Sequence, residues 1–122
     1  MSTATAEPEV RVLNTFNTMA YYEQKVDRIC REGVPLAAVV LDEHIPGWHL
    51  LVTRPIEMQC VNDCVLGQVF GEEGEDADDL FSSGYAKGVL YLRSMGVIDR
   101  PFVFSSEKAA PYWGAEISRR MT

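Results

Sequence analysis

The stretch VPLAAVVLDEH, residues Val34 to His44, decides between a helical and a mixed fold for this chain. Its apolar part is short and rich in valine, which would also suit a buried β-strand. Pro35 fits the first turn of a helix, and the two alanines and the polar LDEH continuation favour a helix over a strand. We therefore expect a helix here, with a strand as the rival interpretation, and expect Ile45-Pro46-Gly47 to end it.

The residues before this stretch predict another helix. Between about Thr18 and Glu32, apolar side chains recur at spacings of three and four residues, and Gly33 stands where a helix C-cap belongs. Those side chains, which should face the core, are Tyr22, Val26, Ile29 and Cys30. Residues 1–9, MSTATAEPE, are small and polar and contain a proline, which is typical of a disordered N-terminal arm.

The rest of the chain predicts a mainly α fold. The chain has 122 residues, of which 47% are hydrophobic, and this fits one domain that buries its own core. We expect a disordered arm over residues 1–9 and a single helical domain over residues 10–122, a compact bundle of about five short helices with irregular connections. The elements expected after His44 are an irregular connection over residues 48–59, a helix over 64–70 capped by Asn62 or Asp63, a helix over 80–95, an extended segment over 97–104, and a last helix from Ser105 or Ser106.

The formal net charge of −7 is unevenly distributed. Residues 32–86 contain eleven acids against Arg54 alone, a net −10, whereas residues 87–122 contain six bases against three acids, a net +3. Phosphate contacts require clustered Lys and Arg, so the sequence argues against direct nucleic-acid binding. An acidic surface of this kind attracts basic proteins instead.

The stretch GEEGEDADD, residues 71–79, concentrates much of this negative charge. The simpler interpretation is a solvated loop that leads into a helix, where the negative acids interact favourably with the positive N-terminal end of the helix dipole. The functional interpretation is a protein-binding contact, or a patch that mimics DNA. The candidate partner-binding residues are Glu72, Glu73, Glu75, Asp76, Asp78 and Asp79.

Two histidines and two cysteines have spacings that zinc tolerates. His44 and His49 form H-x4-H, and Cys60 and Cys64 follow after ten residues as C-x3-C. A zinc-stabilised module is therefore one hypothesis. The other, which we favour, is a capped helix start with a buried Cys64 that is chemically inert. A Cys64 nucleophile would further require a histidine beside it.

The remaining features favour a non-enzymatic protein in a reducing cytoplasm. Three cysteines are an odd number, and neither a secretory leader nor an apolar run of membrane-spanning length appears in the sequence. Trp48 and Trp113 are expected in the core. We expect no cofactor and no membrane contact.

Two motifs, LDEHIPGW and CVLGQVFG, occur in this sequence. Through them the chain resembles small uncharacterised proteins of actinobacterial phages and prophages. Those proteins carry an LDE-x-x-PGW motif and a C-x-LGQ-x-G motif, followed by a helix that contains a tryptophan. The resemblance implies a phage accessory protein in a bacterial cytoplasm and assigns no activity. Cys60, both histidines and the acidic stretch lie outside the pattern. Together with the charge, it predicts a protein that binds a host protein through residues 72–79. The matching residues are Leu41, Asp42, Glu43, Pro46, Gly47, Trp48, Cys64, Leu66, Gly67, Gln68, Gly71, Trp113 and Ile117.

Overall fold

The computed structural model describes the backbone of residues 3–71, 82–97, 100 and 102–122, and the side chains of these residues from Thr18 onward. This part of the chain is mainly helical and contains no strand, which confirms the predicted class. Four α-helices stand in place of about five. The elements are α1 (Thr3–His44), the 3₁₀ helix η1 (Trp48–Leu51), α2 (Val65–Phe70), α3 (Gly84–Ser94), the 3₁₀ helix η3 (Glu107–Ala109) and α4 (Ala110–Arg120).

The most informative difference from the sequence prediction is that α1 is one continuous helix. Residues 34–41 are helical, so the strand alternative is wrong, but the helix neither stops at Gly33 nor restarts at Pro35. Gly33 is needed for close packing instead, because a Cβ there would lie 2.7 Å from Cγ2 of Val103. Helix α1 also includes residues 3–9, for which the sequence predicts a disordered arm.

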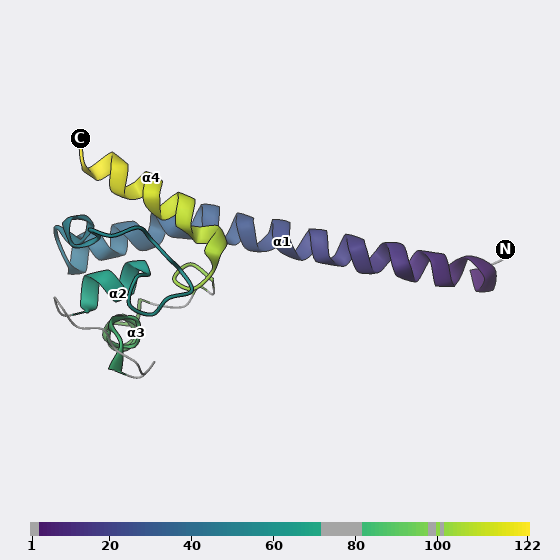
Figure 1. Ribbon diagram of the computed structural model, residues 1–122, viewed down its shortest axis with the longest axis horizontal. Helices are drawn as coiled ribbons and strands as arrows, with labels where there is room; N and C mark the ends of the chain where they lie inside the picture. The colour runs from purple at the N-terminus through teal and green to yellow at the C-terminus, as the bar shows by residue number, and fades with distance from the viewer. Residues whose placement is uncertain (1–2, 72–81, 98–99, 101) are drawn as a thin grey trace.

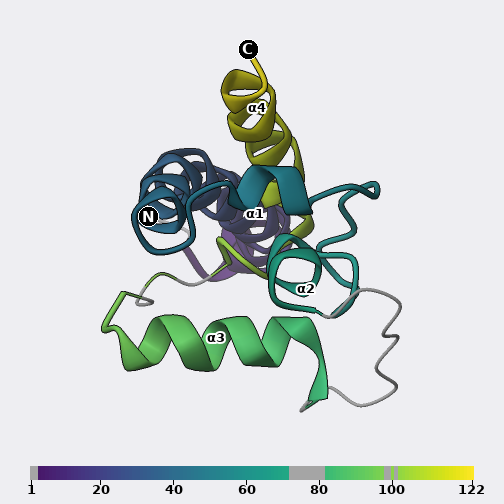
Figure 2. The same cartoon turned by 90° about the vertical axis from the view of Figure 1, so that its left-hand side faces the viewer.

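Helix α1 is much longer than the body of the molecule that packs on it. Figure 1 shows α4 along one side of its C-terminal half and α2 and α3 on the other side, while the N-terminal half projects beyond them. Figure 2 looks along α1 and shows α3 beyond α2, on the side of the molecule away from α4. We call residues 3–25 the arm and the remaining described residues the body.

The core lies between α1, α2 and α4. On α1, the buried apolar side chains follow one stripe at spacings of three or four residues: Val26, Cys30, Val34, Ala38 and Leu41. Trp48 and Trp113 are both fully buried, as the sequence predicts, and their rings meet edge to face with centroids 5.6 Å apart. The other buried hydrophobic residues are Met58, Cys64, Val65, Leu66, Val69, Leu92, Val103 and Ala109.

Helices α2 and α3 pack closely because glycines lie at their contact. A Cβ on Gly84 would overlap the carbonyl oxygen of Gly67 and would lie 2.6 Å from the amide nitrogen of Gly71. A Cβ on Gly88 would lie 2.6 Å from the ring of Phe70. Glycine is usually unfavourable inside a helix, but here the missing side chains of Gly84 and Gly88 allow the two helices to approach closely.

The connection from η1 to α2 is irregular, as predicted, and the buried side chain of Gln68 supports it. Its Oε1 accepts hydrogen bonds from the amides of Thr53 (3.0 Å) and Arg54 (2.9 Å). Its Nε2 donates to the carbonyl oxygens of Arg54 (3.1 Å) and Asp63 (2.9 Å). One amide group therefore satisfies four backbone groups that belong to no helix or strand.

The described part of residues 97–104 contains a turn, not a continuous extended segment, and Phe102 has a positive φ of 70°. This turn brings Val103 against α1 at Gly33. Ser106 then caps η3 by accepting a hydrogen bond from the amide of Lys108, and η3 leads directly into α4. The sequence prediction that a serine at 105 or 106 begins the last helical segment is confirmed.

Candidate functional site

The predicted partner-binding residues, Glu72, Glu73, Glu75, Asp76, Asp78 and Asp79, all lie outside the described residues. The structure does describe the residues that flank this segment. Helix α2 ends at Phe70 and α3 begins at Gly84, and a Cβ on Gly84 would lie only 2.9 Å from Cα of Gly71. The packing of α2 against α3 thus holds Gly71 and Gly84, which flank the acidic segment in the sequence, close together.

The four residues of the zinc hypothesis do not come together. Among the described residues, which include all four, no group of three or more His, Cys, Asp or Glu side chains is arranged to hold a metal ion. The two cysteines have separate roles: Sγ of Cys60 donates to Oδ2 of Asp63 at 3.5 Å, and Sγ of Cys64 accepts from the amide of Gly67 at 3.2 Å. This geometry contradicts a zinc module built from His44, His49, Cys60 and Cys64.

Cys64 is the N-cap of α2, a role that the sequence assigns to Asn62 or Asp63. The thiol is fully buried, and this burial raises its pKa above the usual thiol value. A buried, protonated thiol is a poor nucleophile. The structure therefore supports the interpretation of Cys64 as a structural cap, not as a catalytic or metal-binding group.

Asp42 and Trp48 of the LDEHIPGW motif have structural roles as well. Nε1 of Trp48 donates to Oδ1 of Asp42 at 2.9 Å, and Arg120 of α4 pairs with the same carboxylate. Arg120 also bonds the buried carboxylate of Glu116, and its guanidinium carbon lies 5.5 Å from the centroid of the Trp48 ring. Hydrogen bonding from Arg120 lowers the pKa of Asp42 and stabilises its charged form. This network fastens α4 to α1 and to η1.

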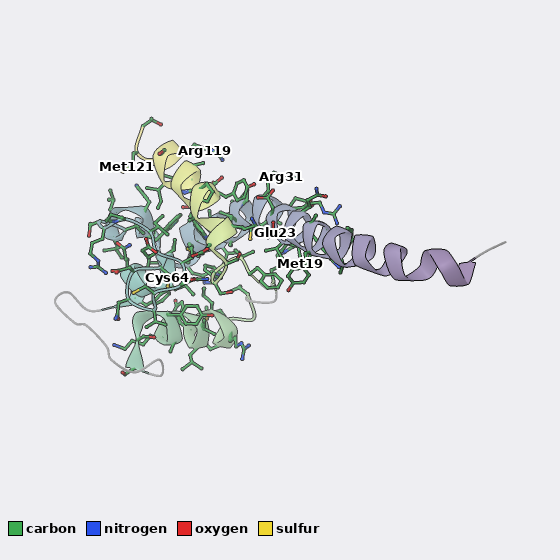
Figure 3. All side chains as sticks on the ribbon, turned by 45° about the vertical axis from the view of Figure 1, so that its right-hand side comes forward. Met19, Glu23, Arg31, Cys64, Arg119 and Met121 are labelled. Atoms are coloured by element: carbon green, nitrogen blue, oxygen red, sulfur yellow. The ribbon has the colours of Figure 1, made fainter. Side chains whose placement is uncertain are left out.

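The arm presents large apolar side chains outside the body. Every residue from Thr18 to Lys25 is exposed, including Met19 at 62% and Tyr22 at 55%. Figure 3 shows Met19 on the projecting part of α1, beyond the elements that cover the rest of the helix. The sequence predicts Tyr22 in the core, and that prediction is wrong because the body begins to cover α1 only at Val26.

Met19 and Tyr22 lie on the same side of α1 as Val26, because spacings of three and four residues return to one helix face. Tyr21 is also exposed, at 60%, but its position places it on the opposite side. We call Met19 and Tyr22 the arm stripe. The ring of Tyr22 meets Phe102 edge to face, with centroids 6.4 Å apart, so the body ends at this side chain.

An open hollow of about 730 Å³ lies where the arm leaves the body. Tyr22 and Val26 of α1 form one wall, and Phe102 and Pro111 belong to its apolar lining on the other side. Charged groups at its rim have both signs, because Glu23 and Asp27 stand there with Lys108. The hollow is continuous with the arm stripe through Tyr22.

Comparison with protein families, curated proteins and solved structures finds no match. In the described part of the chain, no helix combines the length and the apolar character that crossing a membrane requires.

Sequence reasoning missed the arm stripe. The spacing from Met19 to Tyr22 to Val26 is the same as the spacing within the buried stripe from Val26 to Leu41, so periodicity alone does not separate the covered part of α1 from the uncovered part. The boundary between the covered and uncovered parts of α1 depends on how far the other elements of the body extend along the helix, and this is set by tertiary packing.

Proposed function

We propose that this chain is a non-enzymatic accessory protein that acts by binding other proteins. The observation that carries the proposal is the arm stripe: Met19 and Tyr22 expose more than half of their surface on a helix whose continuation is buried. Large apolar side chains grouped outside a body mark interaction surfaces. A continuous helix presents them in a fixed arrangement, which lowers the entropy lost on binding.

The acidic segment, residues 72–79, is the second proposed contact, with a basic host protein as its partner. It is supported by the uneven charge of the chain, which concentrates six carboxylates in these eight residues. Association through six carboxylates should be fast at low salt and weaken as salt increases. A DNA-mimicking inhibitor is a special case of this contact, in which the host partner is a DNA-binding protein.

The resemblance to actinobacterial phage proteins belongs to the same proposal. It supplies the setting, the cytoplasm of an actinobacterial host, in which the partner is to be sought. In the body, Asp42 and Trp48 of the first motif bond each other, and Gln68 of the second motif bonds the backbone of the connection between the two motifs. Residues of both motifs thus stabilise the body. The two proposed contacts, the arm stripe and residues 72–79, lie outside these motifs.

The test is a pulldown of tagged protein from an actinobacterial lysate, at low and at moderate salt. The arm variant carries Met19→Glu and Tyr22→Glu, and its matched control carries Ala20→Glu and Gln24→Glu, which add the same charge on the opposite side of the helix. A third variant replaces the six acids of residues 72–79 by their amides. We expect the native chain to hold a specific host protein that the amide variant releases.

The outcomes separate the two contacts. Equal capture by the native chain and the amide variant would remove the acidic segment from the proposal. Partner binding that is lost only in the arm variant would place the host contact on the arm. A partner that is displaced by duplex DNA would identify the DNA-mimicking case. Failure of all variants, native included, to hold any specific protein would contradict the proposed host contact.

A further inference from the structure

We propose that the hollow beside Tyr22 binds a trimethylammonium group, in the corner between the rings of Tyr22 and Phe102. The inference goes beyond the proposed protein contacts, because it assigns a class of ligand to the hollow itself. It follows from the angle between the two rings, from the way the backbone holds Phe102, and from the carboxylates around the hollow.

The two aromatic rings form a corner. Tyr22 belongs to α1 and Phe102 to the turn before η3, and both side chains line the hollow. The planes of their rings stand at 84° to each other, with centroids 6.4 Å apart. The face of an aromatic ring is negative and attracts a cation within about 6 Å of the centroid. Two perpendicular rings let one cation contact both faces, as in the aromatic cages that recognise quaternary ammonium groups.

The backbone holds Phe102 in place. Its φ is 70°, which bulky residues rarely adopt. Its carbonyl oxygen accepts hydrogen bonds from the amides of Ser105 (3.3 Å) and Ser106 (2.9 Å) and from the thiol of Cys30 (3.7 Å). A strained conformation persists only where its surroundings enforce it, and strained residues of this kind cluster at ligand sites. The turn therefore presents the ring of Phe102 to the hollow before any ligand arrives.

The carboxylates around the hollow favour a cation. Its lining contains Glu23, Asp27 and Glu107 against Lys108, and Lys108 stands at the border because it also lines the neighbouring hollow along α1. Asp27 already pairs with Arg31 at 3.4 Å. Within the part of the chain that the structure describes, Glu23 and Glu107 form no ion pair. Two carboxylates without a counter-ion thus stand beside two aromatic rings.

The apolar walls favour a methylated ammonium over a primary one. Val26 and Pro111 complete the apolar lining around the two rings. A primary ammonium is compact and strongly hydrated, so it loses more when it leaves water. A trimethylammonium group instead brings three methyl groups, which pack against apolar walls while the charge faces the rings. Choline compounds and methylated lysine side chains both carry this group, and the hollow is open enough for either.

Titration of the full chain with choline, followed residue by residue by heteronuclear NMR, tests the site. We expect saturable shifts of the amide signals of Tyr22 and Phe102, while the signals of α3 stay in place. The neutral tert-butyl isostere of choline has the same shape without the charge, so it should bind several-fold more weakly. Ethanolamine, which carries a primary ammonium, should also bind more weakly than choline.

Substitutions of the rings separate a cation site from an apolar hollow. Tyr22→Leu and Phe102→Leu each remove one aromatic face and keep an apolar side chain. Each should weaken choline binding about two- to fivefold, the range for one exposed cation–π contact. The matched control is Tyr21→Leu, an exposed tyrosine on the opposite side of α1, which should bind choline as the native chain does. Tyr22→Leu keeps the test valid if Phe102→Leu fails to fold, because Tyr22 is exposed.

Substitutions of the acids test the charge. The double variant Glu23→Gln with Glu107→Gln should weaken choline binding and make it depend less on salt. The control is Glu32→Gln, which removes an exposed carboxyl of α1 outside the hollow and should leave binding unchanged. Near-ultraviolet circular dichroism of the buried Trp48 and Trp113 checks that each variant keeps the body folded.

Three results would overturn the proposal. These are choline shifts that do not saturate or that centre away from the hollow, equal affinity for choline and its neutral isostere, and unchanged choline binding in a folded Tyr22→Leu variant. The titration contains no host protein, so its result does not depend on the outcome of the pulldown.

A second pair of ligands identifies the source of the group. A short peptide with trimethyllysine is compared with the same peptide carrying unmodified lysine, under the conditions of the choline titration. Tighter binding of the methylated peptide than of choline would assign the hollow to a modified protein. Binding of choline at least as tight as that of the methylated peptide would assign it to a small choline compound. Equal binding of the methylated and unmodified peptides would contradict recognition of the trimethylammonium group.

Discussion

The guanidinium of Arg120 forms two hydrogen bonds with the carboxylate of Asp42, although 78 positions separate the two residues in the sequence. The distances are 2.8 Å from Nε to Oδ1 and 2.6 Å from Nη2 to Oδ2. Two parallel bonds of this kind fix the relative orientation of the planar groups. The pair therefore sets where the end of α4 lies against α1.

Removing the arginine should destabilise the body. In Arg120→Met, the carboxylate of Glu116, which is only 4% exposed, keeps the exposed Arg119 as its one close cation among the described side chains. We expect a loss of about 2 kcal/mol in the free energy of unfolding, measured by urea denaturation. The control is Arg31→Met, which breaks an exposed pair with Asp27 and should cost less than about 0.5 kcal/mol. Equal effects of the two substitutions would contradict a structural role for the Arg120 network.

The same pair predicts a pH dependence. Hydrogen bonding from Arg120 lowers the pKa of Asp42 in the folded chain below its value in the unfolded chain. A carboxyl group with a lowered folded pKa contributes stability that is present above its unfolded pKa and is lost as the pH falls through the folded one. Stability should therefore fall below about pH 4, and less steeply in Asp42→Asn. The midpoint of urea unfolding, measured at several pH values around pH 4, gives this pH dependence of stability. The control is Glu43→Gln, which removes an exposed neighbouring carboxyl group. An unchanged acid slope in Asp42→Asn would exclude Asp42 as a source of the dependence.

Local signals in the sequence predict the elements that depend on local chemistry. The helix over residues 34–44, the serine that begins the last helical segment and the burial of both tryptophans all follow from residue type and spacing. Gly33 shows the limit of this approach. A glycine in a helix pattern is the usual sign of an end, and only the approach of Val103 from a distant segment shows that it allows close packing instead.

The candidate surface was less predictable than the fold. Tyr22 and Val26 have equivalent positions on one helix stripe, yet one is 55% exposed and the other is 7% exposed. Nothing in their spacing differs, since the difference comes from where Phe102 and the rest of the body end along α1. The acidic residues 72–79 were found by composition alone and remain a prediction.

Two glycine-to-alanine substitutions should have opposite effects on the stability of the fold, because Gly67 in α2 is crowded by backbone atoms and Gly114 in α4 is not. In Gly67→Ala, the new Cβ would overlap the carbonyl oxygen of Val61 and lie 2.7 Å from the carbonyl carbon of Asn62. Because backbone atoms do not move aside cheaply, we expect a loss of more than about 2 kcal/mol. In Gly114→Ala, nothing lies within 4 Å of the new Cβ, and the higher helix propensity of alanine should add about 0.5–1 kcal/mol. Thermal unfolding of both variants measures the difference, and a stable Gly67→Ala would contradict the tight packing.

The three thiols should differ in reactivity. Cys30 and Cys64 are fully buried, and burial raises the pKa of each above the usual thiol value. Cys60 is partly exposed. Mild alkylation of the native protein should therefore modify Cys60 first, as measured by peptide mass spectrometry, and all three should react after unfolding in urea. Alkylation of Cys64 before Cys60 in the native state would contradict its role as a buried cap.

Gln68 provides the sharpest test of the irregular connection, because glutamate has the same shape. In Gln68→Glu, one oxygen keeps the bonds to the amides of Thr53 and Arg54, while the other faces the carbonyl oxygens of Arg54 and Asp63 without a proton to donate. We expect a loss of about 2–3 kcal/mol at neutral pH. Burial and the facing carbonyls should raise the folded pKa of this carboxyl, so the loss should shrink as the pH falls through that pKa and the group regains a proton. Urea unfolding at neutral and mildly acidic pH measures both effects, with the exposed Gln59→Glu as the control. A loss that does not depend on pH would show that the hydrogen bonds of Nε2 do not hold the connection in place.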